Sequence, residues 1–356
     1  MKKIGFLTII TAAIFFSACN PDTPSVNEDD QNIPTEAGFS VSPDKRVDFA
    51  KGNLMFHRYP GTLMVDSVYI KTSGSGKNKK YYVDSVKNID KWAVEFPNLH
   101  VRVDSAKVDK TGWVDSVKVE IINPEDTQLV WVDEFEVDAI FEKLQFADNQ
   151  LSYLGITFSS YEKNADEKWV DLFAWSSEKV HWGLSTSNVD SVYSGAFADW
   201  GASYVGDDEK NTWRTLTSDE WGYLRWSRPR ASKLCGAAQV AGVNGLVFLP
   251  DNWTCPAGVT FKSGFHSSYG VDYYAAYQTF TAEQWSKLES AGAVFLPAAG
   301  TRDDSNVYYV QINGYYWSAT GSLSRTAYYL NFFSDEACML SLNRFCGLSV
   351  RLVKDL

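Results

Sequence analysis

Cysteine and histidine are the side chains in this chain best suited to nucleophilic, redox or metal chemistry. The chain has five cysteines and four histidines, at positions 19, 235, 255, 338 and 346 and at 57, 100, 181 and 266. No two of them have the close spacing typical of zinc ligands, so we expect no metal site and no cofactor. In an oxidising compartment the last four cysteines could form two disulfides in any of three connectivities, and the spacing does not choose among them.

The chain lacks the short motifs that identify common hydrolases and nucleotide-binding enzymes. The run GSGK at 74–77 has neither the spacing of a phosphate loop nor the Ser or Thr that should follow it. The formal net charge of −11 makes most carboxylates solvated surface groups and disfavours binding to nucleic acid. We therefore expect no enzyme, although catalytic groups can also assemble from distant positions.

The first nineteen residues predict export and lipid attachment. Lys2 and Lys3 precede an apolar run over 6–16, and small residues then lead to Cys19. The run is shorter than the roughly 20 residues that span a bilayer. We interpret 1–19 as a lipoprotein signal peptide, with the membrane as partner through a lipid on Cys19 and the cell envelope, at the outer membrane, as location. An ordinary secretory signal with a chance cysteine is the alternative.

Residues 20–37 are rich in proline and acidic side chains and poor in apolar ones, which predicts a flexible acidic tether. Beyond the tether, period-two alternation bounded by Gly, Asn and Asp predicts two β-hairpins. One pairs 64–70 with 81–86, and the other pairs 100–108 with 113–122. We interpret 58–143 as a small β-rich insertion.

Capping boxes at 217–220 and 281–284 predict two helices, with Trp221 and Leu224 on the first and Trp285 and Leu288 on the second. Two similar apolar runs that end in proline, at 245–250 and 292–297, predict buried strands.

The sequence Val-Asp-Ser followed by Val or Ala occurs five times, at 65–68, 83–86, 103–106, 114–117 and 189–192. It could be simple strand composition with Asp on the solvent face. It also resembles the O-glycosylation site of exported proteins in some Gram-negative gut bacteria. That resemblance implies glycans on Ser67, Ser85, Ser105, Ser116 and Ser191.

The C-terminal third carries the most specific pattern in the chain. The motifs are NGYYWSAT at 313–320, AYYLNF at 327–332 and GLSVRLV at 347–353. Together they resemble the end of bacterial C-type-lectin-like domains of the formylglycine-generating-enzyme type. Further matches upstream are FSVS at 39–42, KGNL at 51–54, TWRTLT at 212–217, LPDNW at 249–253 and FLPAAGTR at 295–302.

The resemblance covers 38–57 and 144–356, and implies an α+β fold with few helices and short twisted strands. Within its motifs, Trp317 should be a core aromatic, while Gly314 and Gly347 suit tight backbone positions. Arg351 should brace a carboxylate or backbone carbonyls.

Members of this family include the variable proteins of diversity-generating retroelements, whose altered residues form an exposed binding face. The corresponding ligand-binding residues here would be Ser322, Leu323, Ser324, Arg325, Tyr329, Asn331, Phe333, Ser334, Asp335, Leu340, Ser341, Leu342, Phe345 and Leu348. Apolar and polar residues interleaved in this way suit a recognition surface. The alternative is that Leu340, Leu342 and Leu348 simply face the core.

We therefore expect a surface-anchored adhesion or recognition lipoprotein whose partner is a protein or a glycan. No grouping of carboxylates and amides predicts a calcium site. The alternative is a formylglycine-generating-type oxidase or other sulfatase-modifying enzyme that uses Cys338 and Cys346. Cys346 directly precedes Gly347, however, and this spacing departs from that of the family. A purely structural surface component cannot be separated from the first hypothesis by sequence.

Overall fold

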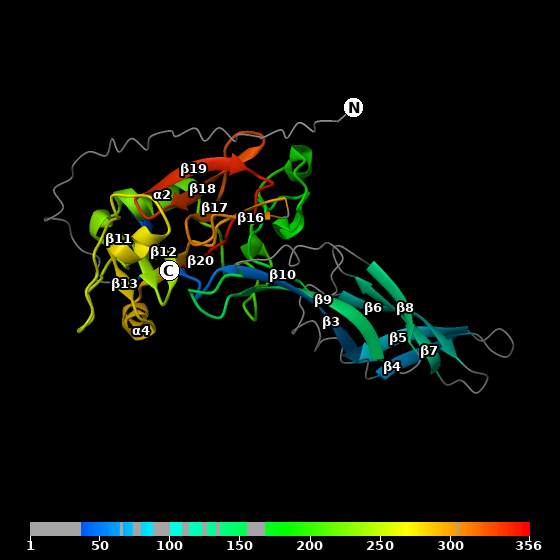
Figure 1. Ribbon diagram of the computed structural model, residues 1–356. Helices are drawn as coiled ribbons and strands as arrows, with labels where there is room; N and C mark the ends of the chain where they lie inside the picture. Colours follow the sequence, from blue (N-terminus) through cyan, green and yellow to red (C-terminus); the bar gives the residue numbers. More distant parts are fainter. Residues whose placement is uncertain are drawn as a thin grey trace, which may run out of the picture.

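The structure is a computed structural model that describes residues 37–64, 67–73, 80–87, 100–108, 114–122, 127–132, 136–154, 168–304 and 306–356. The predicted signal peptide, Cys19 and nearly all of the tether lie outside the described residues. The predicted α+β class with few helices and many short strands is confirmed. Figure 1 shows a body that holds both the early and the late strands, and a long β arm that extends from it.

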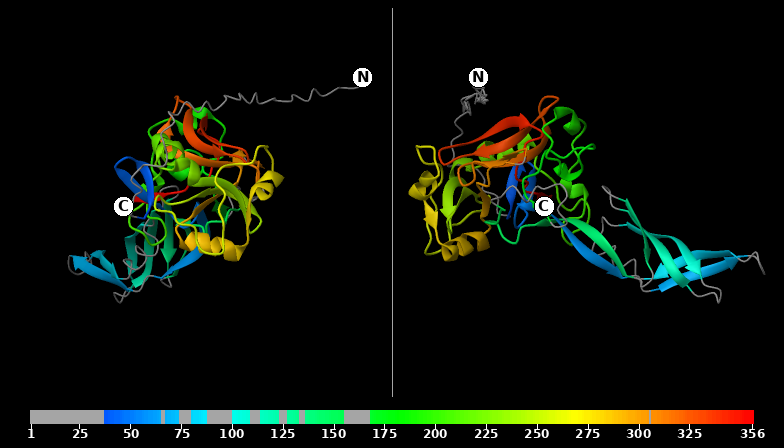
Figure 2. Two further views of the ribbon diagram at one scale, coloured as in Figure 1. Left: turned by 90° about the vertical axis from the view of Figure 1, so that its left-hand side faces the viewer. Right: turned by 45° about the vertical axis from the view of Figure 1, so that its right-hand side comes forward.

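The arm begins as one long antiparallel pair, formed by β3 (Leu54–Met64) and β9 (Glu136–Phe146). Their register runs without a break from Leu54 opposite Phe146 to Met64 opposite Glu136. The same two strands therefore belong to the body at one end and carry the arm at the other, as both views of Figure 2 show. Near the body, β10 (Lys168–Val170) pairs with the other edge of β3.

The far part of the arm contains both predicted hairpins, with shifted ends. The first pairs β4 (Ser67–Ser73) with β5 (Lys80–Lys87), and the second pairs β6 (His100–Val108) with β7 (Val114–Ile122). A third strand, β8 (Thr127–Val132), joins the second hairpin and was not predicted.

The repeated Val-Asp-Ser sequence has a backbone role in these hairpins. The register shifts on β5, β6 and β7 fall at Asp84, Asp104 and Asp115, so each Asp is the extra residue of a β-bulge. When the bulged Asp is not counted, the Val before it and the Val or Ala that follows Ser occupy positions on the same face of the ladder, as Val103 and Ala106 do. In these three copies the repeated sequence thus forms a β-bulge, which plain strand alternation did not predict.

The body contains three further sheets that matter for the candidate site. The first sheet contains, in spatial order, β1 (Phe39–Ser42), β2 (Lys45–Phe49) and β20 (Val353–Asp355). The second contains β13 (Thr279–Phe280), β11 (Cys235–Val240), β12 (Val243–Phe248) and β14 (Val294–Pro297). The third is β17 (Gly314–Gly321), β18 (Thr326–Phe332) and β19 (Ala337–Asn343). A short pair, β15 (Thr301–Asp303) and β16 (Asn306–Tyr308), leads into β17. The two similar apolar runs are confirmed as buried strands, and they pair with each other as β12 and β14.

Both predicted helices begin at their capping boxes. Thr217 caps α2 (Ser218–Gly222), and Thr281 caps α4 (Ala282–Ser290). In each box the side chain of the third helical residue accepts a hydrogen bond from the backbone N–H of the cap. The first helix differs from the prediction after Gly222, where a π-helical turn spans Tyr223–Ser227. A third helix, α3 (Asp272–Tyr277), has no side-chain cap and was not predicted.

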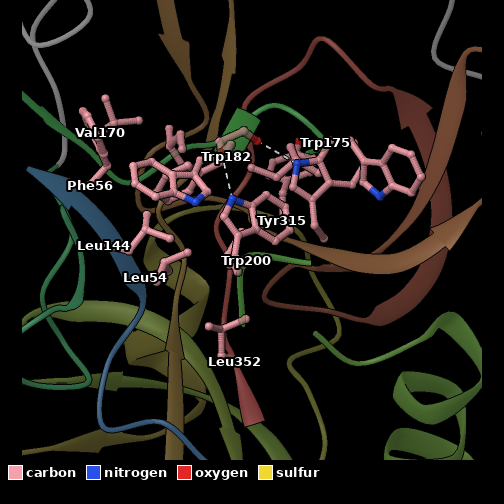
Figure 3. Close-up of a cluster of buried hydrophobic side chains, with 14 of the residues drawn as sticks. Leu54, Phe56, Leu144, Val170, Trp175, Trp182, Trp200, Tyr315 and Leu352 are labelled. Atoms are coloured by element: carbon pink, nitrogen blue, oxygen red, sulfur yellow. Dashed lines mark hydrogen bonds between the residues drawn. The ribbon is translucent and has the colours of Figure 1, made fainter. Parts of the chain in front are cut away.

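The main core is rich in tryptophan, and the indole N–H of each buried tryptophan in it finds a hydrogen-bond acceptor. The Nε1 atom of Trp317 donates to the carbonyl of Phe173 at 2.7 Å, and that of Trp200 donates to Trp182 at 2.7 Å. Figure 3 shows the rings of Trp182 and Trp200 packed near Leu54 and Leu144. Trp317 is 1% exposed, so its predicted core role is confirmed.

Four of the sequence motifs meet in one buried hydrogen-bond network. The guanidinium of Arg351 donates to Asn53 Oδ1 at 2.9 Å and to the carbonyl of Phe295 at 2.9 Å. Asn53 in turn donates to the hydroxyl of Tyr316, which donates to Pro297. Arg351 also donates to the backbone carbonyl of residue 50, so its predicted bracing role is confirmed.

The two predicted tight glycines are confirmed as well. A Cβ atom at Gly314 would collide with the ring of Phe332 on the neighbouring strand. At Gly347 it would lie 2.6 Å from Arg302 Nε and 2.7 Å from the carbonyl of Leu172. Neither position can accept a larger residue without displacing its neighbours.

Candidate binding face

The C-terminal sheet carries most of the predicted ligand-binding residues. Its order is β17-β18-β19, with Tyr329 opposite both Trp317 and Leu340. Residues directly opposite one another share a face of an antiparallel sheet. The face that holds Tyr329, Leu340 and Leu342 packs toward the main core, while Tyr328 and Ser341 are exposed on the other face.

The predicted residues fall into three classes of exposure. Leu323, Ser324, Arg325 and Ser341 are exposed, and Ser322, Phe333, Asp335, Leu340, Leu342 and Phe345 are half-buried. The remaining four, Tyr329, Asn331, Ser334 and Leu348, are buried. Leu348 forms a bridge with Phe173 inside the core, so the alternative that it is a core strand residue describes it better. The buried residues support the face and do not form its surface.

The exposed members cluster at the hairpin between β17 and β18. Leu323 is 75% exposed, the largest exposure of any large apolar side chain in the described chain. The hairpin is held by reciprocal backbone bonds, from Ser322 N to Thr326 O and from Thr326 N to Leu323 O. Arg325 reaches Asp190 at 3.1 Å, but both side chains are too exposed for this ion pair to add much stability.

The turn between β18 and β19 is locked to a loop from a distant part of the chain. The hydroxyl of Ser334 donates to Ser268 O at 2.9 Å and accepts from Gly270 N at 3.0 Å. The carbonyl of Ser334 also accepts from His266 N. Ser334 therefore fixes the position of the loop at 266–270 beside the sheet.

Aromatic side chains from this loop and from the segment before β17 surround the turn. Tyr269 is 50% exposed and meets the ring of Phe333 edge-on at 5.3 Å. Tyr309 is 45% exposed and lies 6.5 Å from the ring of Tyr315, which stacks on Tyr329 at 5.6 Å. We call Tyr269, Tyr309, Tyr315 and Phe333 the aromatic platform.

Hydrogen bonds hold the platform rings in place. The hydroxyl of Tyr269 donates to Asn313 Oδ1 at 3.2 Å, and Asn313 Nδ2 donates to the hydroxyl of Tyr315 at 2.7 Å. Burial raises the pKa of Tyr315 above its usual value, so this phenol stays protonated at neutral pH. The platform is therefore a neutral, preorganised surface.

Two carboxylates lie beside the platform. Asp335 has one oxygen, Oδ1, that is buried without a hydrogen-bond partner. Burial, and then the charge of Asp335, raise the pKa of Glu336 above its usual value. Neither carboxylate forms an ion pair with a cation in the described part of the chain.

Only part of the aromatic platform could be predicted from the sequence. Phe333, Asp335 and the supporting Tyr329 were predicted, but Tyr269 and Tyr309 come from segments without a recognised motif. Tyr309 has a left-handed backbone, with φ of 61°, which is rare for a residue of its size. The sequence signal that could have indicated Tyr309 was the pair of consecutive tyrosines at 308–309, shortly before the core strand β17.

The cysteines do not form a reactive pair in the described residues. No disulfide joins the cysteines at 235, 255, 338 and 346, and Cys255 is the exposed one. Burial, followed by the charge of Asp303, raises the pKa of the Cys346 thiol to about 12. This thiol is therefore protonated at neutral pH, whereas a nucleophilic cysteine needs a lowered pKa.

Among the residues that the structure describes, no group of three or more His, Cys, Asp or Glu side chains is placed to hold a metal ion. No helix in the same residues is both long and apolar enough to cross a membrane.

The serines of the repeated sequence lie in two different settings. Ser67, Ser85, Ser105 and Ser116 lie on β4, β5, β6 and β7 of the arm. Ser191 is instead exposed on a short 3-10 helix, Asp190–Tyr193, in the body.

The fold and the site define a mixed α+β protein with an aromatic, acidic surface at its C-terminal sheet. Comparison of the chain with protein-family models, with curated proteins and with solved structures gave no match.

Proposed function

We propose that this protein is a lipid-anchored surface protein that binds a protein or glycan ligand. The binding surface would be formed by β18, the β17–β18 hairpin and the aromatic platform, which together we call the C-terminal face. One observation carries the proposal. In the described chain, most of the exposed large apolar side chains lie on β18, on the β17–β18 hairpin or in the segments 269–273 and 308–309: Tyr269, Val271, Tyr273, Tyr308, Tyr309, Leu323 and Tyr328. Concentrated exposed apolar groups on a rigid scaffold are typical of recognition surfaces.

The fold proposed for the body is a C-type-lectin-like domain of the formylglycine-generating-enzyme type. Its support is the buried network in which Asn53, Phe295, Tyr316 and Arg351 bond to one another. These residues come from four separate motifs of the resemblance. If the body has the same fold as that family, its motifs should lie close together in space, as these four residues do. The arm, which has no counterpart in the resemblance, is proposed as an insertion between 57 and 144.

The exposed part of the face is also proposed to be diversified, as in the variable proteins of retroelements. Deep sequencing of the 3′ end of the gene across a cell population tests this directly. We expect substitutions at adenine-templated codons within 319–348, beside a template repeat and a reverse transcriptase, while Trp317 and Val350 stay fixed. A uniform 3′ end without a template would contradict diversification and leave fixed ligand binding in place.

We propose that a lipid on Cys19 anchors the protein in the cell envelope at the outer membrane, exposed at the cell surface. Metabolic labelling with a palmitate analogue should mark the wild type but not Cys19→Ser. Protease treatment of intact cells should then degrade the body if it faces outward. A labelled Cys19→Ser protein would contradict lipidation at this residue.

Glycans on Ser67, Ser85, Ser105, Ser116 and Ser191 are proposed on the repeated sequence alone. The intact mass of the natively expressed protein should exceed that of the bare lipoprotein by a whole number of glycans. A mass equal to that of the bare lipoprotein would contradict the proposal.

The oxidase alternative has less support. Its candidate nucleophile, Cys346, is buried and has a raised pKa, and the structure gives it no cationic neighbour that outweighs burial. Binding without chemistry accounts better for the site.

A further inference from the structure

A short segment that follows α2 concentrates positive charge in this acidic chain. No acidic residue occurs anywhere in 221–250. Four cations lie close together within that range: Arg225, Arg228, Arg230 and Lys233. We call 225–233 the basic segment. Because the chain as a whole carries a net charge of −11, the basic segment is a local exception to its surface charge.

Arg228 fixes the basic segment to the body, and the other three cations are partly or fully exposed. The buried guanidinium of Arg228 donates to Asp251 Oδ1 at 3.0 Å and to the carbonyls of Leu224 and Leu234. The chain then turns at Arg230, whose backbone is left-handed with φ of 60°. Such a conformation is costly for a residue with a Cβ atom, and it is typical of functional sites.

The exposed cations of the basic segment have no compensating carboxylate. In the part of the chain that the structure describes, Arg225, Arg230 and Lys233 form no ion pair. Arg225 instead lies over the half-buried rings of Trp226 and Phe265, 5.6 and 5.0 Å from their centroids. Guanidinium groups bind phosphate oxygens in pairs, and tryptophan favours the headgroup level of a bilayer. A cluster of this composition therefore suits a phosphate-bearing membrane surface.

The basic segment lies where the predicted tether enters the body. Ser40, on the first strand β1, donates from its backbone N–H and its hydroxyl to Asp251, both at 2.7 Å. The guanidinium of Arg228 also lies 5.7 Å from the centre of the Phe39 ring. A flexible chain of the tether's length spans about 25 Å on average and about 60 Å at most. A lipid on Cys19 would therefore keep this side of the body close to the bilayer.

We propose that the basic segment docks on phosphate-bearing headgroups of the membrane to which the chain is anchored. This inference rests on the lipid anchor of the proposed function and adds a second, electrostatic contact to it. Carboxylates elsewhere on the surface oppose the contact little, because salt screens charges more than about 8–10 Å apart. The basic segment directly follows α2, which lies on the side of the body away from the arm (Figure 1), so docking leaves the arm clear of the membrane.

The test measures how close the body lies to the bilayer when the lipidated full-length protein is inserted into preformed vesicles. A fluorescent donor on Cys255, which is exposed in the loop after Asp251, and an acceptor on the lipid headgroups report this distance by energy transfer. The vesicles contain phosphatidylcholine alone or with anionic phosphatidylglycerol. We expect higher energy transfer with phosphatidylglycerol, and loss of this increase in about 1 M NaCl, where the Debye length is about 3 Å.

Matched variants separate the basic segment from the bulk charge of the molecule. Arg230→Gln with Lys233→Gln removes two unpaired cations and should abolish the increase in energy transfer. Lys51→Gln with Lys179→Gln removes the same charge from two exposed lysines in other segments and should keep the increase. Since Arg230 and Lys233 form no ion pair in the described chain, their variant should unfold at the wild-type temperature.

An increase that the Arg230→Gln, Lys233→Gln protein retains, or that the lysine control loses equally, would overturn the proposal. A change of the same size in neutral and anionic vesicles would overturn it too, and would assign the basic segment to the acidic tether of the same chain. The palmitate label reports anchoring separately. A labelled wild-type protein that shows no increase with phosphatidylglycerol would therefore refute docking while the proposed function stands.

Discussion

Single buried polar residues hold the body together mainly through backbone carbonyls. Arg351 is buried and its pKa is lowered to about 10 by desolvation, which still leaves it charged at neutral pH, and it donates to one side chain and two carbonyls. Arg228 is the exception, because it pairs with the buried carboxylate of Asp251 at 3.0 Å. Asp251 also accepts from the backbone and the hydroxyl of Ser40, so one residue joins three segments.

Asp251→Asn should destabilise the protein by about 3–5 kcal/mol, because it leaves the buried charge of Arg228 without compensation. Chemical denaturation gives the measurement, with the exposed substitution Asp219→Asn as its control. A loss of less than about 1 kcal/mol would show that water or relaxation compensates Arg228.

Cysteine reactivity provides a second test at this scale. Iodoacetamide at neutral pH should modify Cys255, which is exposed, long before Cys346, whose pKa is raised to about 12. Peptide mass spectrometry after timed alkylation measures both rates. Rapid modification of Cys346 in the folded protein would contradict the structure and return the oxidase alternative to consideration.

At the scale of elements, local signals were predictable and long-range assemblies were not. The capping boxes at Thr217 and Thr281 and the buried strands β12 and β14 could be predicted because each depends on neighbouring residues, whereas the pairing of these two strands was not predicted. The π-helical turn after Gly222 and the bulges at Asp84, Asp104 and Asp115 were missed, since backbone irregularities lack a simple period. Tyr269 and Tyr309 of the aromatic platform were missed for a different reason, because tertiary contacts alone bring their segments beside the C-terminal sheet.

The cap of α2 also links the helix to the C-terminal strand and makes this link sensitive to acid. Burial alone would raise the pKa of Glu220, but hydrogen bonds from Arg214 and Thr217 outweigh it and lower the pKa. Asp355 on β20 likewise has a pKa lowered by Arg214, against the effect of burial. Because folding lowers the pKa of these two carboxyl groups, they stabilise the fold when the pH is above their usual pKa range. This stabilisation is lost as the pH falls through the lowered pKa values.

The unfolding temperature should therefore decrease as the pH falls below about 4. Arg214→Gln should be less stable than the wild type at pH 7 by only about 1 kcal/mol, because Asp355 is half exposed and its ion pair is weak. The variant should also lose less stability on acidification, because Arg214 no longer lowers the pKa of Glu220 and Asp355. Thermal unfolding between pH 7 and pH 3 measures both effects. Parallel curves for the variant and the wild type would show that this cluster does not set the acid response.

At the scale of the whole molecule, one continuous pair of strands joins the body and the arm in the described part of the chain. Tyr59 and Phe141 lie opposite each other in that pair, so the chain can be closed there by an Asn-Gly turn in place of 60–140. The shortened protein should unfold cooperatively at nearly the same temperature, because the body core uses Leu54, Phe56 and Leu144 on the retained side. Loss of cooperative unfolding would show that the arm is part of the folding unit.

The central claim is that the C-terminal face binds a ligand, and a comparison of binding by matched variants tests it most directly. Fluorescently labelled full-length protein is applied to arrayed glycans and extracellular proteins, as wild type, as Leu323→Ser with Tyr309→Asn, and as Leu356→Ser. Leu356 is exposed like Leu323 but lies at the chain end beside β2, and Asn suits the left-handed backbone at 309. We expect the wild type and Leu356→Ser to bind the same ligand, and the double variant to lose at least about tenfold in affinity. Undiminished binding by the double variant would contradict the account.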